Sequence, residues 1–129
     1  MTEVVVFPDV VAWATSCIAT GLAANGYADV VVDDRYNGAS KAVWVRRDGG
    51  PQLDHFREAA RLAVNVLVKA SSDKPANDLA RLVSALLRAG ADGTPVLNVT
   101  QTSGPSPIPD AAGPHVYLTF EAQVRGTPL

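Results

Sequence analysis

The segment HVYLTFEAQVR, residues 115–125, constrains the fold most, because apolar and polar side chains alternate along it without interruption. One set of alternate positions holds Val116, Leu118, Phe120, Ala122 and Val124, and the other holds Tyr117, Thr119, Glu121, Gln123 and Arg125. A period of two places the two sets on opposite faces of a strand. The pattern predicts an antiparallel sheet with one face in the core and the other in water.

Four further segments predict strands: residues 28–33, 41–47, 61–69 and 95–102. Branched residues recur at every second position of 61–69, which favours a strand over a helix. Asn37-Gly38 predicts a tight turn between the first two strands. Glycine and proline interrupt the pattern at residues 48–58, where the stretch 54–60 looks more helical or irregular than a simple hairpin loop.

Two segments predict helices. The first follows Phe7-Pro8-Asp9, with proline suited to the first turn and Asp9 to the positive end of the helix dipole. Its apolar stripe comprises Val11, Ala14, Ile18 and Leu22, with Val10, Trp13 and Cys17 beside it. The second follows Ser71-Ser72-Asp73 and ends at Gly90, with an apolar face of Leu79, Leu82, Val83, Leu86 and Leu87.

The predicted order is therefore α-β-β-β-α-β-β. Strands and helices in this order indicate an α+β fold, in which two helices pack on one face of a mainly antiparallel sheet. A length of 129 residues fits a single domain, residues 1–129.

The segment SGPSPIPDAAGP, residues 103–114, separates the last two predicted strands and reads as a stiff loop. Prolines at Pro105, Pro107 and Pro109 restrict the backbone, so such a loop would lose little conformational entropy when it docks on a partner. We expect an interface formed by Pro105, Pro107, Ile108, Pro109 and Asp110. Tyr117 joins this set because an aromatic ring among polar neighbours is typical of a contact surface.

The corner between residues 45 and 51 is the second predicted interface. It comprises Arg46, Arg47, Asp48, Gly49, Gly50 and Pro51. Charged strand ends of this kind are usually solvated, and some form salt bridges between subunits.

Catalytic and metal-binding patterns are missing from the sequence. His55 and His115 lie sixty positions apart without Cys, Asp or Glu at metal-ligand spacing, and both read as surface histidines. Cys17, the single cysteine, reads as a small buried residue and fits a reducing cytoplasm. There is no nucleophile elbow and no phosphate-binding glycine loop. We therefore expect no enzyme, no cofactor and no metal.

Charge and hydropathy exclude other classes. The net charge of −2 argues against a protein that grips nucleic acid, and a hydrophobic content of 47% argues against disorder. We see no signal-peptide pattern and no apolar run of the ~20 residues that a membrane helix needs.

Taken in order, the first helix FPDVVAWATSCIATGLAANG, the corner VRRDGGP, the helix DLARLVSALLRAG and the ending SGPSPIPDAAGPHVYLTFEAQVRG cover nearly the whole chain. This arrangement resembles the small tail terminator proteins of long-tailed phages that infect actinobacteria. The resemblance is most specific at the VRRDGGP corner and over residues 104–126.

The resemblance implies a structural virion protein that is assembled in the host cytoplasm. Such proteins form a hexameric ring on the head-proximal end of the tail tube, stop tube polymerisation and present a surface to the head-side connector. It further implies that the tail tube protein and the connector or stopper protein are partners, and that DNA passes through the lumen without specific binding. We expect no membrane partner.

Two alternatives remain at this level. A head–tail stopper or connector is another small ring-forming α+β protein of the phage neck, and the sequence separates it poorly from a terminator. A small non-viral ligand-binding module would need ionisable residues that converge on a pocket, which the pattern does not show.

Overall fold

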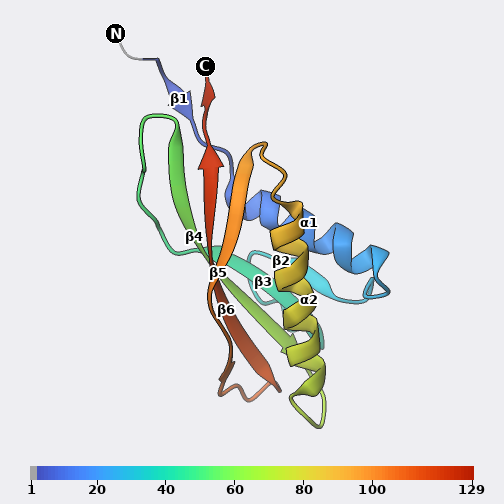
Figure 1. Ribbon diagram of the computed structural model, residues 1–129. Helices are drawn as coiled ribbons and strands as arrows, with labels where there is room; N and C mark the ends of the chain where they lie inside the picture. The colour runs from blue at the N-terminus through green and yellow to red at the C-terminus, as the bar shows by residue number, and fades with distance from the viewer. Residues whose placement is uncertain (1–2) are drawn as a thin grey trace.

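In a computed structural model that describes residues 3–129, the main elements follow the predicted order α-β-β-β-α-β-β, so the α+β prediction is confirmed. The elements are β1 (Val5–Val6), α1 (Val10–Ala24), β2 (Val31–Asp33), β3 (Lys41–Arg47), β4 (Arg57–Val68), α2 (Lys74–Gly90), β5 (Val96–Ile108), β6 (His115–Arg125) and β7 (Thr127–Pro128). Five strands form one sheet in the order β2-β3-β4-β6-β5, and β1 pairs with β7 in a separate ribbon. Both helices cover the same face of the large sheet (Figure 1).

The alternation predicted for residues 115–125 is confirmed in β6. Val116, Leu118 and Phe120 are at most 2% exposed and lie in the core under the helices. Their partners on the adjacent central strand β4 are Val66, Val64 and Leu62, which are also buried. The two most apolar strands therefore lie side by side, and together they form the centre of the core.

The start of β4 differs from the prediction. The strand begins at Arg57, so the expected helical or irregular stretch 54–60 is wrong for its second half. Ala59 and Ala60 pair with Gln123 and Ala122 of β6. Small side chains favour a helix in isolation, but the ladder with β6 decides the conformation here.

The proline-rich segment is also corrected. Residues 103–108 belong to β5, which continues to Ile108 and pairs with β6, so only the stretch from Pro109 to Pro114 is a turn. The strand accommodates its prolines because β5 lies at the edge of the sheet and has register shifts around Ser103. At Gly104 the backbone comes so close to Tyr117 that a Cβ would lie 2.4 Å from the Tyr117 carbonyl oxygen. The stiff loop of the prediction is therefore mostly an irregular edge strand.

Asn37-Gly38 does not form a hairpin turn. The strand β2 is parallel to β3, with Val31 opposite Ala42 and Asp33 opposite Trp44. The connection 34–40 must therefore return the chain to the same end of the sheet, which a tight turn cannot do.

Helix α1 begins as predicted, but its buried stripe differs from the predicted stripe at its first residue. The Asp9 carboxylate caps it by accepting a hydrogen bond from the Ala12 N–H (3.0 Å). Pro8 precedes this cap and lies outside the first turn. The fully buried stripe is Val10, Ala14, Ile18 and Leu22, so Val10 takes the core position that the pattern predicts for Val11.

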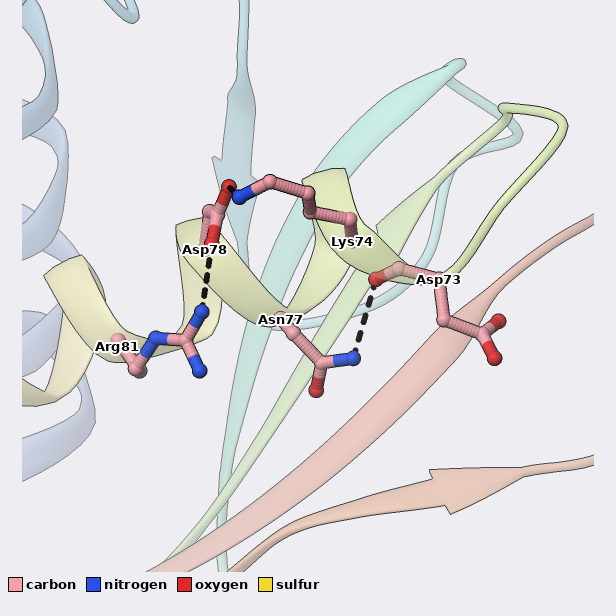
Figure 2. Close-up of polar contacts among 5 residues, drawn as sticks. All are labelled: Asp73, Lys74, Asn77, Asp78 and Arg81. Carbon is pink, nitrogen blue, oxygen red and sulfur yellow. Dashed lines mark hydrogen bonds and ion pairs between the residues drawn. The ribbon is translucent and has the colours of Figure 1, made fainter.

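Helix α2 carries the charges that α1 lacks. At its start, Asp78 accepts from Lys74 (2.7 Å) and Arg81 (2.6 Å), and the Asn77 side chain donates to the Asp73 carbonyl (3.1 Å), as Figure 2 shows. These contacts are solvent-exposed, so each adds little to the stability of the helix. The opposite face of α2 packs on the sheet.

The two helices meet at glycines. A Cβ on Gly90 would lie 2.4 Å from the Cys17 sulfur, and a Cβ on Gly21 would lie 2.5 Å from Leu86. Gly90 is thus required for close packing of α2 on α1, whereas its φ is not positive, so the helix end itself does not require a glycine there.

Candidate interaction surface

No helix or strand of residues 3–129 covers the face of the large sheet opposite α1 and α2 (Figure 1); we call it the open face. The cross-strand register places Trp44 of β3, Asn65 of β4, Tyr117 of β6 and Ser106 of β5 in one row across it. The open face is the part of the molecule on which residues from both predicted interfaces meet.

The centre of the open face holds a polar chain through His115. The Nδ1 atom of His115 lies 3.0 Å from a carboxylate oxygen of Asp110, and Nε2 lies 2.9 Å from the side-chain oxygen of Asn65. The His115 side chain is 9% exposed, so the prediction of a surface histidine is wrong. A protonated ring donates to both oxygens, whereas a neutral ring donates to only one.

Asp110 is the exposed end of this chain. The Ala112 backbone N–H donates to its carboxylate (2.8 Å), and this bond together with the His115 ring holds the pKa of Asp110 below its ordinary value. The Asp110 carboxylate therefore connects the short turn from Pro109 to Pro114 with His115 of the sheet.

Aromatic rings cover the same region. The Trp44 ring lies 4.9 Å from that of Tyr36 and 5.1 Å from that of His115, measured between centroids. Both pairs are tilted, as is favourable for aromatic contacts. Tyr36, Trp44 and His115 thus form one partly buried aromatic cluster between β3 and β6.

Arg46 connects the corner to this face. Its guanidinium donates to Asp48 (2.9 Å), and this bond raises the pKa of Arg46, with a smaller contribution from Tyr117. Arg46, Asp48 and Tyr117 are therefore neighbours, although they come from two separate predicted sets.

Other residues of the corner 46–51 form contacts within the protein. Arg47 forms an ion pair with Glu58 (2.9 Å), whose side chain is 12% exposed. Gly49 and Pro51 accept backbone hydrogen bonds from β4, so the chain continues the β3–β4 ladder past the end of β3. Gly50 lies against β4 so closely that a Cβ would be 1.9 Å from the Ala59 carbonyl oxygen. These residues shape the hairpin, and whether they also contact a partner stays a prediction.

The proline-rich set divides in the same way. Pro107 and Ile108 lie in β5 opposite Val116 and His115, while Pro105 lies at a register shift. Pro109 and Asp110 are exposed in the turn. The structure therefore places Asp110 and Tyr117 on or beside the open face and Pro105 on the outer edge of the sheet.

Two concave regions of the surface are wide and shallow. The depression of about 450 Å³ near Phe56 and Arg125 and the groove of about 460 Å³ near Trp13 and Cys17 both open widely to solvent. Burial raises the pKa of the Cys17 thiol, which disfavours the reactive thiolate. Within residues 3–129, no three His, Cys, Asp or Glu side chains gather as a metal site would require.

None of the helices described in residues 3–129 is long and apolar enough to cross a membrane.

Sequence reasoning missed one feature of the open face and one feature of the chain ends. Asn65 is 8% exposed and holds His115, and the single polar position in the apolar run of β4 was the signal for it. Apolar side chains are also exposed at the chain ends, at Val4, Val6 and Leu129. The sequence pattern there is too short to reveal a face.

No protein-family model matches the chain, and no curated protein matches it. Among solved structures, a chain of the virion of a native gene transfer agent particle is similar, with a TM-score of 0.65 and 19% sequence identity. The similarity covers 92% of this chain and 100% of that chain. At this identity the similarity shows a shared α+β fold. It gives no information about the individual residues of the open face.

Proposed function

We propose that this protein is a structural virion component: a tail terminator that forms a hexameric ring on the head-proximal end of a phage tail tube. The observation that carries the proposal is the shared fold with a chain of a gene transfer agent virion along almost the full length of both chains. The tail tube protein and the head-side connector or stopper protein are the proposed partners.

The distribution of polar groups supports a role in assembly. The ionisable side chains of Arg47, Glu58 and His115 are used in internal contacts. An enzyme would leave such groups directed into a pocket. An uncovered sheet face with aromatic side chains fits a protein–protein interface instead.

We assign the contact residues within the ring, or between it and the adjacent ring, to the two predicted sets. The first is Arg46, Arg47, Asp48, Gly49, Gly50 and Pro51, and the second is Pro105, Pro107, Ile108, Pro109, Asp110 and Tyr117. Of these, Arg46, Asp110 and Tyr117 have the best geometry for direct contact, because they lie at the surface near the uncovered aromatic cluster.

DNA would pass through the lumen of such a ring without being read. The net charge of −2 supports this, because a wall rich in arginine and lysine would hold the phosphate backbone and slow its passage.

The mass of the purified protein tests the ring. Native mass spectrometry and light scattering are expected to find a species of six times the 13.5-kDa chain mass, alone or on addition of a purified tail tube protein. Electron microscopy then separates the two neck roles. A terminator caps tail tubes that have no head attached, whereas a stopper or connector binds the head-side portal and leaves free tube ends bare. A strict monomer under all these conditions would refute both.

A further inference from the structure

Exposed apolar side chains gather at one end of the molecule. Six large apolar residues of the described chain are at least 36% exposed, and five of them lie in the chain ends and in the loop between β3 and β4. These five, Val4, Val6, Leu53, Phe56 and Leu129, define what we call the apolar end. Exposed apolar side chains that cluster in this way mark an interaction site more often than scattered ones do.

The apolar end is held together by backbone contacts. Nε2 of His55 lies 2.6 Å from the Glu3 carbonyl oxygen, and Gly126 N–H donates to the Phe56 carbonyl (2.7 Å). Leu129 N–H donates to the Val4 carbonyl (2.9 Å), beside the β1–β7 pairing. In Figure 1 the β3–β4 loop, β1 and β7 accordingly lie together beyond the helices. The side chains are thus presented by an ordered unit.

This end also carries two arginines, Arg57 and Arg125. Arg57 and Arg125 lie directly opposite each other on β4 and β6, an arrangement of like charges that is unfavourable in a sheet. Asp54 neutralises Arg57 (2.7 Å), but Arg125 has no ion pair within residues 3–129. A depression of about 450 Å³ beside Arg125 is lined in addition by Phe56 and Pro128. A partner that fits here supplies an acidic group next to an apolar one.

The same chain presents that combination at the β2 edge, which we define as Val31, Asp33 and Asp34. Val31 is 36% exposed and is the sixth of the exposed apolar residues. Asp33 has no cation at ion-pair distance among the described residues, and Asp34 has only the distant Arg35 (3.5 Å), which is itself 82% exposed. A depression of about 270 Å³ with Asp9, Asp33 and Asp34 in its wall lies there.

Each of the two surfaces also contains a strand with a free edge. β2 is the last strand of the large sheet, and β1 pairs only with β7, so each has one free edge of main-chain donors and acceptors. Both strands are short and rich in valine. Free edges of this kind pair readily with a strand from another chain.

We infer that the apolar end of one copy of this protein lies against the β2 edge of a second copy, with Arg125 facing Asp33 and Asp34. A second copy is the occupant because one chain carries both halves: Arg125 and Asp33, which have no ion pairs among the described residues, exposed valines and free strand edges. Two different patches that meet in this way form a heterologous contact, which generates rings when it closes. The inference rests on the proposed ring and names the two surfaces that would join its subunits, which leaves the two predicted sets for contacts with the adjacent ring.

Charge reversal tests the pairing of Arg125 with the β2 edge. Arg125→Glu, or Asp33→Arg together with Asp34→Arg, is expected to raise the concentration at which the assembly dissociates at least about tenfold. The triple variant should recover most of this loss, because the charges are opposite again. Lys69→Glu is the control, since it reverses an exposed charge at the far end of β4 and should leave assembly unchanged. Equal loss in the triple variant and either parent overturns the contact.

Disulfide trapping tests the geometry independently. Cys17 is the single cysteine, so a Cys17→Ser background allows Phe56→Cys and Val31→Cys to be combined without other thiols. Mild oxidation of the double variant should produce a ladder of covalent oligomers on a non-reducing gel. Each single variant should remain uncrosslinked, which shows that the two positions pair with each other and not with themselves.

The outcomes distinguish the contact from the function. Closed hexamers without cross-links between positions 31 and 56 overturn this inference and leave the proposed ring intact. Covalent dimers only, carrying two disulfides each, support the contact and refute the ring. A monomer without cross-links overturns the inference, and the tail-tube experiment above then decides the function. Far-ultraviolet circular dichroism of each variant verifies that it is folded.

Discussion

Nε2 of His115 lies 2.9 Å from the side-chain oxygen of Asn65, across two adjacent central strands of the sheet. This contact joins β4 to β6, and the same His115 ring lies 5.1 Å from the Trp44 ring between centroids. It also links the turn after β5 to the middle of the open face, because the other nitrogen of the same ring contacts Asp110.

Asn65→Ala should therefore destabilise the protein by about 1–3 kcal/mol, since it leaves a largely buried ring nitrogen without a partner. Asn98→Ala is the matched control, because Asn98 lies exposed on β5, and its loss should cost no more than about 0.5 kcal/mol. Urea unfolding followed by circular dichroism measures both. Equal effects would show that the Asn65–His115 contact contributes nothing to stability.

Two neighbouring glycines in the β3–β4 hairpin should respond very differently to substitution. Both have positive φ, +73° at Gly49 and +115° at Gly50, but only at Gly50 would a Cβ meet the Ala59 carbonyl oxygen. Gly49→Ala should cost about 1–2 kcal/mol through backbone strain alone. Gly50→Ala should cost about 3 kcal/mol or more, because the backbone at residue 50 must also move away from Ala59 of β4. Thermal unfolding of the pair provides the test, and equal melting temperatures would contradict the close approach.

The close approach of Gly90 to Cys17 predicts that the effect of Gly90→Ala on stability depends on the residue at position 17. Gly90→Ala alone should destabilise the protein by about 1–3 kcal/mol, because the new methyl group would overlap the Cys17 sulfur. In a Cys17→Ala background the sulfur is gone, and the same change should be neutral or stabilising by up to about 1 kcal/mol, as alanine is a better helix former. A double-mutant cycle in urea measures the coupling. Additive costs would show that α2 does not pack on Cys17.

Asp110 predicts part of the acid sensitivity. Its pKa is lowered in the folded protein, chiefly by the Ala112 N–H and further by His115, so the folded state favours the ionised carboxylate. Its contribution to stability is present above the unfolded pKa of about 3.9 and is lost as the pH falls through the lower folded pKa.

Asp110→Asn should consequently show a smaller fall in the urea midpoint between about pH 5 and pH 2.5 than the unsubstituted protein. Some fall will remain, because the pKa values of Asp29, Asp54 and Asp78 are lowered by their lysine and arginine partners. Identical pH profiles for the two proteins would rule out a folded-state role for the Asp110 carboxylate.

Elements whose side chains repeat with a clear period could be predicted from the sequence. The alternation in β6 and the apolar face of α2 are local patterns, and each predicts both the element and its buried side. The Asp9 cap of α1 was recognisable for the same reason, since the donor and the acceptor lie three residues apart.

Features that depend on residues far apart in the chain could not be predicted in this way and became visible in the three-dimensional fold. β5 continues through its prolines because β6 offers a ladder on one side and solvent lies on the other. The parallel pairing of β2 with β3, the contact of Asn65 with His115 fifty residues away and the apolar end follow from how the strands are ordered. A periodic pattern states which face of a strand is buried, but it carries no information about which strand lies beside it, and that choice places the candidate surfaces.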